Sequence, residues 1–434
     1  MEKLGWHSLG KSFDCECGVR HELPIEVCYL GDGAAQRLAA FARDKCGATC
    51  LVVSDENTRN VGGERLLSAL SASGKKCREK IYGPDPLEAT EELGEEVAKI
   101  GADVDFFVAI GSGTLCDLAK YAGHKWGRPV LLFATAASMN GYTSSIVAMK
   151  IRGLKRTSPV TPALGVFADP AVVATAPTKM AAAGVGDFLS KTSSSSDWYA
   201  AHFLRGEYYC RRPSDFFEGT QERLLAAAPR VAQRDPEAVA VVLEALMLAG
   251  FSMVVAGSSA PASGGEHLIS HYLDMKHATK KTPNDLHGAQ VGVGAVYALR
   301  LWEQVLALDP AAMDVESLLD RQPSEAQIEK WIRDDWGPVA PEVLSQWRQK
   351  MLGRERMGAE IEKFRKGLPE LRVALARELL PAETVARAIR ESGGATKPED
   401  LEAPVEEYYN ALRFARFLRN RFTILDLAAE VGVT

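Results

Sequence analysis

Residues 105–122 read DFFVAIGSGTLCDLAKYA, and this stretch decides the fold. Residues 105–110 form a short, continuous apolar run, which is typical of a buried strand. Gly111 and Gly113 follow directly, and they let the backbone turn sharply and approach a ligand closely. The helical pattern that comes next would present free N–H groups and the positive end of its dipole, a combination that suits a pyrophosphate.

This glycine turn lacks the G-x-G-x-x-G spacing of the Rossmann fingerprint, and many strand–helix turns contain glycine, so alone it is weak evidence. An earlier strand, residues 50–54, leads into Asp55, and a carboxylate at that place often accepts hydrogen bonds from a dinucleotide ribose. An Asp that caps a helix or a turn is the alternative interpretation. Residues 133–145, FATAASMNGYTSS, follow another strand and are small and rich in hydroxyls. They would suit a nicotinamide and its ribose, with a polar surface loop as the alternative.

The alternation of strand and helix extends over the first 170 or so residues. Strand-like runs occupy residues 25–30, 50–54, 105–110 and 129–133, and helical patterns occupy residues 34–45 and 87–100. Continuous apolar strands that alternate with helices indicate a parallel sheet covered on both faces. Beyond residue 177 the segments are long and helical, at 220–232, 236–256, 288–306, 324–332, 340–351, 382–392 and 405–420. The sequence therefore predicts a Rossmann-like α/β domain over residues 1–174 and an all-α domain over residues 175–434.

The composition fits this organisation. The chain has 434 residues, of which 46% are hydrophobic and 25% charged, as expected of a soluble globular protein with two domains. Fifty-one Lys and Arg against 57 Asp and Glu give a net charge of −6, which argues against a general nucleic-acid binder. The apolar run 239–256 just reaches the length of a membrane span, but it contains Glu244, and we expect a buried helix. The N-terminus lacks the pattern of a signal peptide, so we expect a cytoplasmic protein with reduced cysteines and no membrane partner.

Four of the eight histidines lie between residues 267 and 287. His267 follows SGGE, His287 follows NDL, and an earlier segment, AGVGD, ends at Asp187. One Asp and two neutral His residues make a plausible three-ligand site for a divalent cation, with a fourth position open to water or substrate. The alternatives are that Asp187 only caps its helix and that His267 and His271 are ordinary polar residues on one helical face. His277 lies in a charged stretch and is expected to face solvent.

A second pattern with metal-binding chemistry lies near the N-terminus. Cys15 and Cys17 are separated by one residue, and Gly18 and His21 follow. Cysteines and a histidine at this spacing could contribute to a metal site, but a structural zinc site needs four ligands. No partner pair with standard spacing follows in the sequence. A short β-hairpin with a glycine at its turn is therefore the simpler interpretation.

Taken together, these motifs resemble the iron-containing alcohol dehydrogenase superfamily, which shares its fold with dehydroquinate synthase. The strings that carry the resemblance are GSGTLCDLAKYA, TAASMNGYTSS, GVGD, SGGEH and LHG. Within that group the chain is most similar to the bacterial type of glycerol-1-phosphate dehydrogenase, through SMNGYTSS, SGGEHLISHYLDMK, Asp197-Trp198 and residues 419–425, RNRFTIL. The resemblance covers nearly the whole chain. It implies metal-dependent, NAD(P)H-linked, reversible reduction of dihydroxyacetone phosphate to sn-glycerol 1-phosphate, a role in phospholipid biosynthesis, and a homo-oligomer, most simply a dimer.

The resemblance also implies roles for individual residues. Asp187, His267 and His287 would hold one divalent metal ion, for which zinc, nickel and iron are all suitable. Asn140 and His271 would face the substrate. The residues that would contact NAD or NADP are Asp55, Gly111, Ser112, Gly113, Thr114, Leu115, Asp117, Thr135, Ser138 and Ser144.

Several points stay open at this level. Relatives often have Asp where this chain has Asn140, and Asn can neither carry charge nor act as a base. The remaining alternatives are a glycerol or polyol dehydrogenase, a dehydroquinate synthase-like lyase and a dinucleotide-binding pseudoenzyme, the last of which the intact Asp/His/His set disfavours. Asp55 favours NAD, but Arg59 could lie near the ribose. Lys191 and Lys276 are candidates for the substrate phosphate only because they lie near the motifs in sequence.

Overall fold

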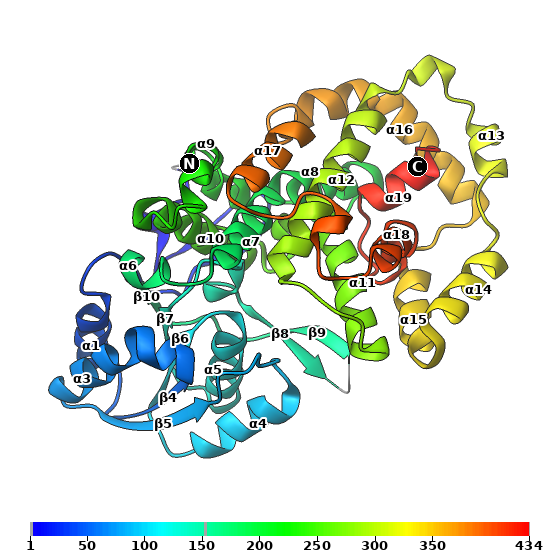
Figure 1. The fold of residues 1–434 in the computed structure, drawn as a ribbon. Coiled ribbons are helices and arrows are strands. Elements are labelled where there is room, and N and C mark those ends of the chain that lie inside the picture. The colour runs from blue at the N-terminus through cyan, green and yellow to red at the C-terminus, as the bar shows by residue number, and fades with distance from the viewer. Residues whose placement is uncertain (1–2, 152–153, 434) are drawn as a thin grey trace.

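A computed structural model describes residues 3–151 and 154–433. Its α/β half contains a six-stranded sheet in the order β3-β10-β7-β6-β4-β5, and every neighbouring pair is parallel (Figure 1). The strands are β3 (Val27–Leu30), β4 (Thr49–Asp55), β5 (Lys76–Tyr82), β6 (Phe106–Gly111), β7 (Val130–Ala134) and β10 (Gly165–Ala168). The predicted parallel sheet is therefore confirmed. Because all six strands point the same way, the turns that follow them meet at one edge of the sheet.

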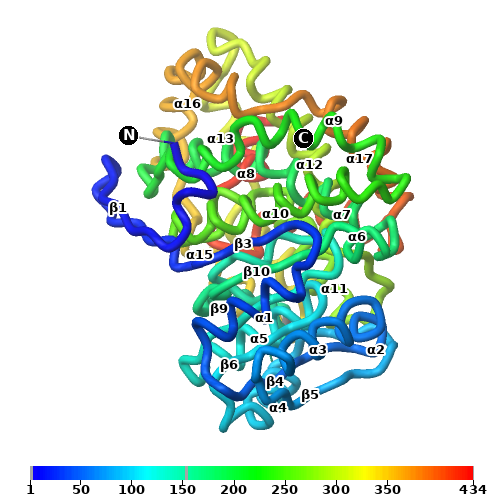
Figure 2. Tube along the Cα trace, turned by 90° about the vertical axis from the view of Figure 1, so that its left-hand side faces the viewer, coloured from blue at the N-terminus to red at the C-terminus, as the bar shows by residue number. Residues whose placement is uncertain are grey.

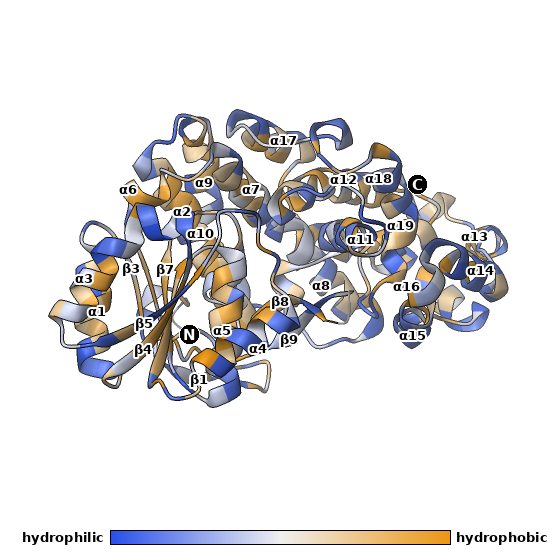
Figure 3. Cartoon of the chain, turned by 60° about the horizontal axis from the view of Figure 1, so that its bottom comes forward, coloured by the Kyte–Doolittle hydropathy of each residue, from blue (hydrophilic) through white to orange (hydrophobic). Residues whose placement is uncertain are grey.

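Helices cover both faces of this sheet. On one face lie α1 (Ala34–Lys45) and α3 (Glu64–Ala72), and on the other lie α4 (Glu91–Ile100) and α5 (Gly113–Trp126) (Figure 3). All residues of β6 and β7 are buried, which explains their uninterrupted apolar sequence. In the register of these two strands Gly111 lies beside Ala134, so the glycine turn and the hydroxyl-rich segment start side by side.

The rest of the chain is helical, as predicted. Its main helices are α7 (Thr178–Leu189), α8 (Lys191–Arg205), α9 (Thr220–Val231), α10 (Pro236–Ala256), α11 (Gly265–Lys280), α12 (His287–Ala307), α13 (Val315–Asp320), α14 (Glu325–Trp336), α15 (Ala340–Lys350), α16 (Arg354–Leu375), α17 (Ala382–Glu391), α18 (Val405–Phe414) and α19 (Ile424–Glu430). Within the described residues, α10 is the one helix that is long and apolar enough to cross a membrane, but most of it is buried in the core. The expected buried helix is confirmed.

Several elements were not predicted individually: strands β5, β8 (Ile146–Ile151), β9 (Leu154–Pro159) and β10, and helices α7, α8, α11 and α16. The edge strand β5, KCREKIY, contains four charged residues, and it was not predicted because it is not buried on both faces. The hairpin of β8 and β9 was also missed; β8 is largely apolar, whereas β9 is largely charged and polar. Its residues pair with the helical half: Lys155 lies 2.6 Å from Asp274, and Arg156 lies 2.7 Å from Glu342. This hairpin therefore joins the two halves of the molecule.

The N-terminal residues also lie on the helical half. The backbone N–H of Leu4 donates to Asp215, and the ring of Trp6 packs edge-on against Phe251 of α10 at 5.4 Å. The chain then forms a two-stranded hairpin before it enters the sheet at β3 (Figure 2).

Helices α7 and α12 pack against each other through glycines. A Cβ atom added at Gly186 would lie 2.7 Å from the carbonyl oxygen of Gly288, and one added at Gly288 would clash with the carbonyl oxygen of Ala183. These backbones can approach so closely only because neither glycine carries a side chain. Asp187 directly follows Gly186, and His287 directly precedes Gly288, so the glycine contact sets the separation of these two side chains.

We expect Gly288→Ala to lower the free energy of unfolding by about 1–3 kcal/mol, the usual cost of overpacking a close contact. The added methyl group meets backbone atoms, which cannot rotate away. Urea unfolding measures the change. Gly353→Ala is the matched control, because Gly353 has an ordinary φ of −69° and no atom within 4 Å of the added Cβ. Equal stability of the two variants would contradict the close contact.

Candidate metal and dinucleotide site

A cavity of about 1070 Å³ lies between the carboxyl edge of the sheet and the helical half. This size is at the upper end of typical ligand-binding sites. The predicted site residues that line it are Asp55, Ser112, Gly113, Thr114, Leu115, Asp117, Thr135, Ser138, Asn140, Ser144, His267, His271 and His287. Gly111 and Asp187 do not line this cavity; Asp187 is completely buried and hydrogen bonded to Asn140 in its wall. The structure thus brings residues from distant segments to one place.

The glycine turn places a helix N-terminus at the cavity. Strand β6 ends at Gly111, Ser112 occupies the position before the helix, and α5 begins at Gly113. The first N–H groups of a helix have no acceptor within it, so those of α5 are free to bind an anion. The hydroxyls of Ser112 and Ser138 lie 2.6 Å apart and join this turn to the next one.

Asp55 caps a helix at the edge of the cavity. Its carboxylate accepts a hydrogen bond from the backbone N–H of Thr58 at 2.7 Å, so it caps a helix, and it also lines the cavity. Arg59 does not line the cavity, and its Nε donates to Glu79 at 2.9 Å.

The hydroxyl-rich segment is not a surface loop. Tyr142, Thr143 and Ser144 are fully buried, and the hydroxyl of Tyr142 donates to the carbonyl oxygen of Ala136 at 2.5 Å. Lys120, which is also fully buried, donates to the carbonyl oxygen of Gly141 at 2.9 Å and thereby fixes the segment to helix α5. The surface-loop alternative is wrong because the helical half covers this segment.

Asp117 supports the next strand as well as lining the cavity. Its carboxylate accepts a hydrogen bond from the backbone N–H of Ala148 at 3.0 Å. Burial raises the pKa of Asp117 to about 6, although the nearby Lys120 lowers it.

The three proposed metal ligands come together from three helices. Asp187 lies in the last turn of α7, His267 in the first turn of α11, and His287 at the start of α12. Nε2 of His267 lies 3.9 Å from Oδ1 of Asp187, and the rings of His267 and His287 are 5.2 Å apart. His267 therefore lies close to both Asp187 and His287.

Partners of the Nδ1 atoms orient both histidine rings. Nδ1 of His267 lies 2.9 Å from Oε1 of Glu266, and Nδ1 of His287 lies 2.9 Å from the hydroxyl of Ser270. A ring held at Nδ1 keeps Nε2 for a metal, and this arrangement is usual for metal-binding histidines. Burial lowers the pKa of His267 well below its usual value and lowers that of His287 to about 4, so both rings stay neutral, as metal ligands must.

The buried charge of Asp187 has several partners. Nζ of Lys191 lies 2.7 Å from Oδ1, and the backbone N–H and side-chain amide of Asn140 donate to the carboxylate at 3.0 and 3.2 Å. Burial alone would raise the pKa of Asp187, but Lys191 and the two histidines lower it below its usual value. Asn140 thus donates through its side-chain amide to the carboxylate of Asp187, which the side chain of an ionised Asp could not do.

Two lysines that the sequence suggested for the substrate phosphate are not placed for it. Neither lines the cavity: Lys191 is fully buried beside Asp187, and Lys276 lies 2.6 Å from Asp335. The expectation is wrong because proximity in sequence to a motif does not fix the direction of a side chain. The basic residues that do line the cavity are Lys150, Lys155, Arg419 and Arg421.

Two of these basic residues, Arg419 and Arg421, were quoted from the sequence only as part of a motif. Arg419 donates to the carbonyl oxygen of Leu418 at 3.3 Å and, within the described residues, forms no ion pair. Arg421 donates to the hydroxyl of Ser259 at 2.9 Å and to the carbonyl oxygen of Ser263. Both arginines are half-buried, and desolvation lowers the pKa of both guanidinium groups. Two arginines in one short segment were the signal that could have identified them.

His271 and His277 both line the cavity. The ring of His271 stacks on that of His287 at 5.9 Å, and its buried Nδ1 has no hydrogen-bond partner among the residues that the structure describes. His277 was expected to face solvent, which is wrong in part, because its Nε2 lies 3.1 Å from Glu88 on the other side of the cavity.

Asp197 connects the motifs that were far apart in the sequence. Its buried carboxylate accepts hydrogen bonds from the backbone N–H of Gly265 at 2.7 Å, from that of Ile424 at 3.0 Å and from the indole of Trp302 at 3.1 Å. The start of α11, which carries His267, is thereby fixed to the C-terminal segment that carries Arg421.

Comparison with known proteins identifies the relatives of this chain. Residues 29–177 match the model of the iron-containing alcohol dehydrogenase family. The curated glycerol-1-phosphate dehydrogenase [NAD(P)+] of Bacillus licheniformis is 31% identical, over 75% of this chain and 84% of that protein. The enzyme of the same name from Geobacillus stearothermophilus is 28% identical, over 96% of this chain and 96% of that protein. The one from Thermococcus kodakarensis is 32% identical, over 65% of this chain and 80% of that protein.

Solved structures share the fold. Sulfoacetaldehyde reductase from Bifidobacterium kashiwanohense in complex with NAD+ superposes with a TM-score of 0.57 at 16% identity, covering 95% of this chain and 97% of that one. Glycerol dehydrogenase from Schizosaccharomyces pombe gives a TM-score of 0.55 at 17% identity, covering 81% and 92%. The sheet and the helical half therefore have the dehydroquinate synthase-like arrangement that the resemblance implies.

The lowered pKa of His287 predicts how the stability of the metal-free protein depends on pH. Between pH 6.5 and about 4 an unfolded histidine binds a proton that the folded His287 does not, so stability falls as the pH is lowered through this range. The slope reaches about 1.4 kcal/mol per pH unit for each such histidine. Urea unfolding at pH 7.5, 6 and 5 in the presence of a chelator measures it. The variant His287→Gln should have a smaller slope than the wild type. His124→Gln is the control at an exposed position and should keep the wild-type slope. An unchanged slope in His287→Gln would contradict a buried neutral ring.

Proposed function

The chain belongs to the glycerol-1-phosphate dehydrogenases within the iron-containing alcohol dehydrogenase family, and from this premise we propose that it reduces dihydroxyacetone phosphate to sn-glycerol 1-phosphate with NAD(P)H, reversibly. One observation carries the proposal. A single cavity contains the free N-terminus of α5, two of the three metal-binding side chains and two arginines. Dinucleotide, metal and a phosphorylated substrate could therefore occupy it together.

In this proposal Asp187, His267 and His287 hold one divalent metal ion. The donor set fits, since both histidines are neutral and oriented through Nδ1 and the carboxylate is ionised. When bound, such an ion polarises the ketone oxygen of the substrate. Asn140 positions the carboxylate of Asp187, so its presence in place of Asp does not argue for a pseudoenzyme.

The chain's own residues bind and orient the other reactants. The N–H groups at the start of α5 bind the pyrophosphate of the dinucleotide, and Asp55 accepts hydrogen bonds from the ribose. Thr135, Ser138 and Ser144 would hold the nicotinamide end of the dinucleotide, which would supply the hydride for the substrate carbonyl. His271, which lines the cavity, would hold a substrate hydroxyl or transfer its proton.

Arg419 and Arg421 bind the substrate phosphate. Both arginines line the cavity, and Arg419 forms no ion pair within 4.0 Å among the described residues, although the carboxylate of Glu342 lies close enough to stabilise its charge. A half-buried arginine without a directly bonded carboxylate favours an anionic substrate over free glycerol. We therefore prefer the phosphorylated substrate to the polyol alternative.

We keep the division of the chain near residue 174 as part of this proposal. Residues 1–174 would chiefly bind the dinucleotide, and residues 175–434 would chiefly hold the metal and the phosphate. The hairpin β8–β9 and the N-terminal residues reach across this division.

We expect His267→Ala to lose the metal at this site and to lose turnover, because the variant keeps two of three protein ligands. Binding of NADH, followed by fluorescence titration, should change little, since the dinucleotide-binding residues lie on other elements. His124→Ala is the control for an exposed histidine and should keep both metal and activity. Full activity of His267→Ala in metal-free buffer would contradict the proposed mechanism.

We expect Arg419→Ala to raise KM for dihydroxyacetone phosphate about 10- to 100-fold, the effect of losing one charge-assisted hydrogen bond of about 1.5–3 kcal/mol. Its turnover of unphosphorylated dihydroxyacetone should change by less than about threefold, since that substrate has no phosphate to bind. Steady-state oxidation of NADH measures both. Arg413→Ala, on the surface of α18, is the matched control. An equal loss with both substrates would show that Arg419 does not bind the phosphate.

A further inference from the structure

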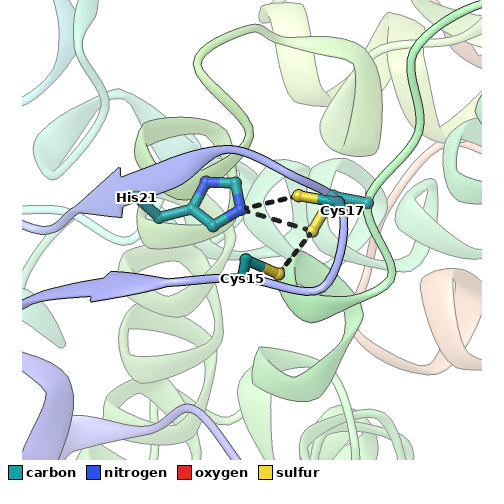
Figure 4. Close-up of side chains that lie close together, drawn as sticks. Cys15, Cys17 and His21 are labelled. Atoms are coloured by element: carbon teal, nitrogen blue, oxygen red, sulfur yellow. Dashed lines mark hydrogen bonds between the residues drawn. The ribbon is translucent and has the colours of Figure 1, made fainter.

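The N-terminal hairpin brings three potential metal ligands together. Strands β1 (Ser12–Asp14) and β2 (Arg20–Glu22) are antiparallel, and the loop between them contains Cys15, Cys17 and Gly18. Gly18 has a φ of +83°, and its N–H donates to the carbonyl oxygen of Cys15 at 2.9 Å, which folds the loop back on itself. The side chains of Cys15, Cys17 and His21 consequently point toward one another (Figure 4).

A fourth ligand comes from the helical half. Cys210 lies 189 residues after His21, in the segment that follows α8. Its Sγ lies 3.7 Å from Sγ of Cys15 and 3.5 Å from Nε2 of His21. Sγ of Cys17 lies 3.2 Å from the same Nε2, and all four ligand atoms lie within 4.8 Å of one another.

These separations match a tetrahedral site. Zinc bonds of about 2.3 Å to sulfur and about 2.0–2.1 Å to nitrogen place two sulfurs about 3.8 Å apart, and a sulfur and a nitrogen about 3.5 Å apart. The three measured distances of 3.7, 3.5 and 3.2 Å are close to these values. Three thiolates and one imidazole are also a donor set that zinc prefers, and such a set leaves no open position.

The surroundings suit a structural site. His21 and Cys210 are buried, and the sulfurs lie in a small apolar cluster with Trp198, Tyr209 and Ala256. The ring of Tyr209 packs edge-on against Trp198 at 4.9 Å and shields one side. None of the four ligands lines the cavity described above, so this is a second site.

We propose that Cys15, Cys17, His21 and Cys210 bind a structural zinc ion that fastens the N-terminal hairpin to the helical half. The hairpin leads directly into β3 of the sheet, whereas Cys210 follows α8, the helix that carries Lys191 and Asp197. Binding replaces the thiol protons of the three cysteines, which pass to solvent, and involves no change in oxidation state. The site thus links the first strand of the sheet to the helix that supports the proposed metal ligand Asp187.

Cobalt substitution tests the site without any mutation. The full-length protein, purified under reducing conditions and stripped of metal, is titrated with Co²⁺ alone. We expect a thiolate-to-cobalt charge-transfer band in the near ultraviolet, whose final intensity corresponds to one three-thiolate site per chain. Asp187, His267 and His287 provide no thiolate, so the band reports only on the cysteine cluster and is independent of the proposed activity. Absence of this band in the wild-type protein overturns the proposal.

Variants then assign the ligands. Metal analysis of the zinc-loaded protein should show one equivalent lost in Cys17→Ser and in Cys210→Ser, while Cys46→Ser, a half-buried thiol outside the cluster, keeps it. His21→Cys should retain the band because it preserves four ligands, which keeps the test valid if a serine variant fails to fold. An unchanged band in Cys210→Ser overturns the role of Cys210.

A disulfide is the competing arrangement. Zinc should protect Cys15, Cys17 and Cys210 from alkylation until a chelator is added, without any reductant. A Cys15–Cys210 disulfide would instead remain protected after chelation and react only after reduction, with an intact mass two hydrogens lower. That result would overturn the proposal.

Discussion

The carboxylate of Asp187 has no contact with water, and its charge must be balanced by groups from several segments at once. The ammonium group of Lys191 comes from the next helix, and the two N–H donors of Asn140 come from the turn after β7. An unbalanced buried charge costs several kcal/mol. The position of this one carboxylate therefore constrains both halves of the molecule: the turn of the α/β half donates to it, and the helical half surrounds it.

Features set by local sequence could be predicted from the chain alone. The continuous apolar strands β6 and β7 and the glycines after β6 predicted the parallel sheet and the helix N-terminus at the cavity, because buried strands and tight turns leave strong local patterns. The residue types made Asp187, His267 and His287 a plausible metal site, and the family resemblance implied their role. Their close approach and burial are products of tertiary packing, whereas their partners Lys191 and Glu266 are sequence neighbours, four residues after Asp187 and directly before His267.

Long-range partners were the part that sequence could not supply. No fourth ligand follows Cys15, Cys17 and His21 at a spacing that is usual for zinc sites. The structure brings Cys210 to them from the other half of the chain. Lys276 was suggested for the phosphate because it lies near the motifs in sequence, yet its side chain pairs with Asp335. Arg419, from the C-terminal segment, lines the cavity instead. The hairpin β8–β9 was missed for a related reason, since the ion pairs of Lys155 and Arg156 in β9 are made with the distant helical half.

The hydrogen bond from the backbone of Ile424 to Asp197, together with the contacts of Arg421, bears on how the protein is made. During translation the strands from β3 to β10 leave the ribosome first and can pair with one another early. The residues from 419 to 424 emerge much later than the segments that they complete. Until then the start of α11 lacks this hydrogen bond, and the cavity lacks the part of its wall that Arg419 and Arg421 provide. The cavity is therefore completed only when synthesis of the chain is almost over.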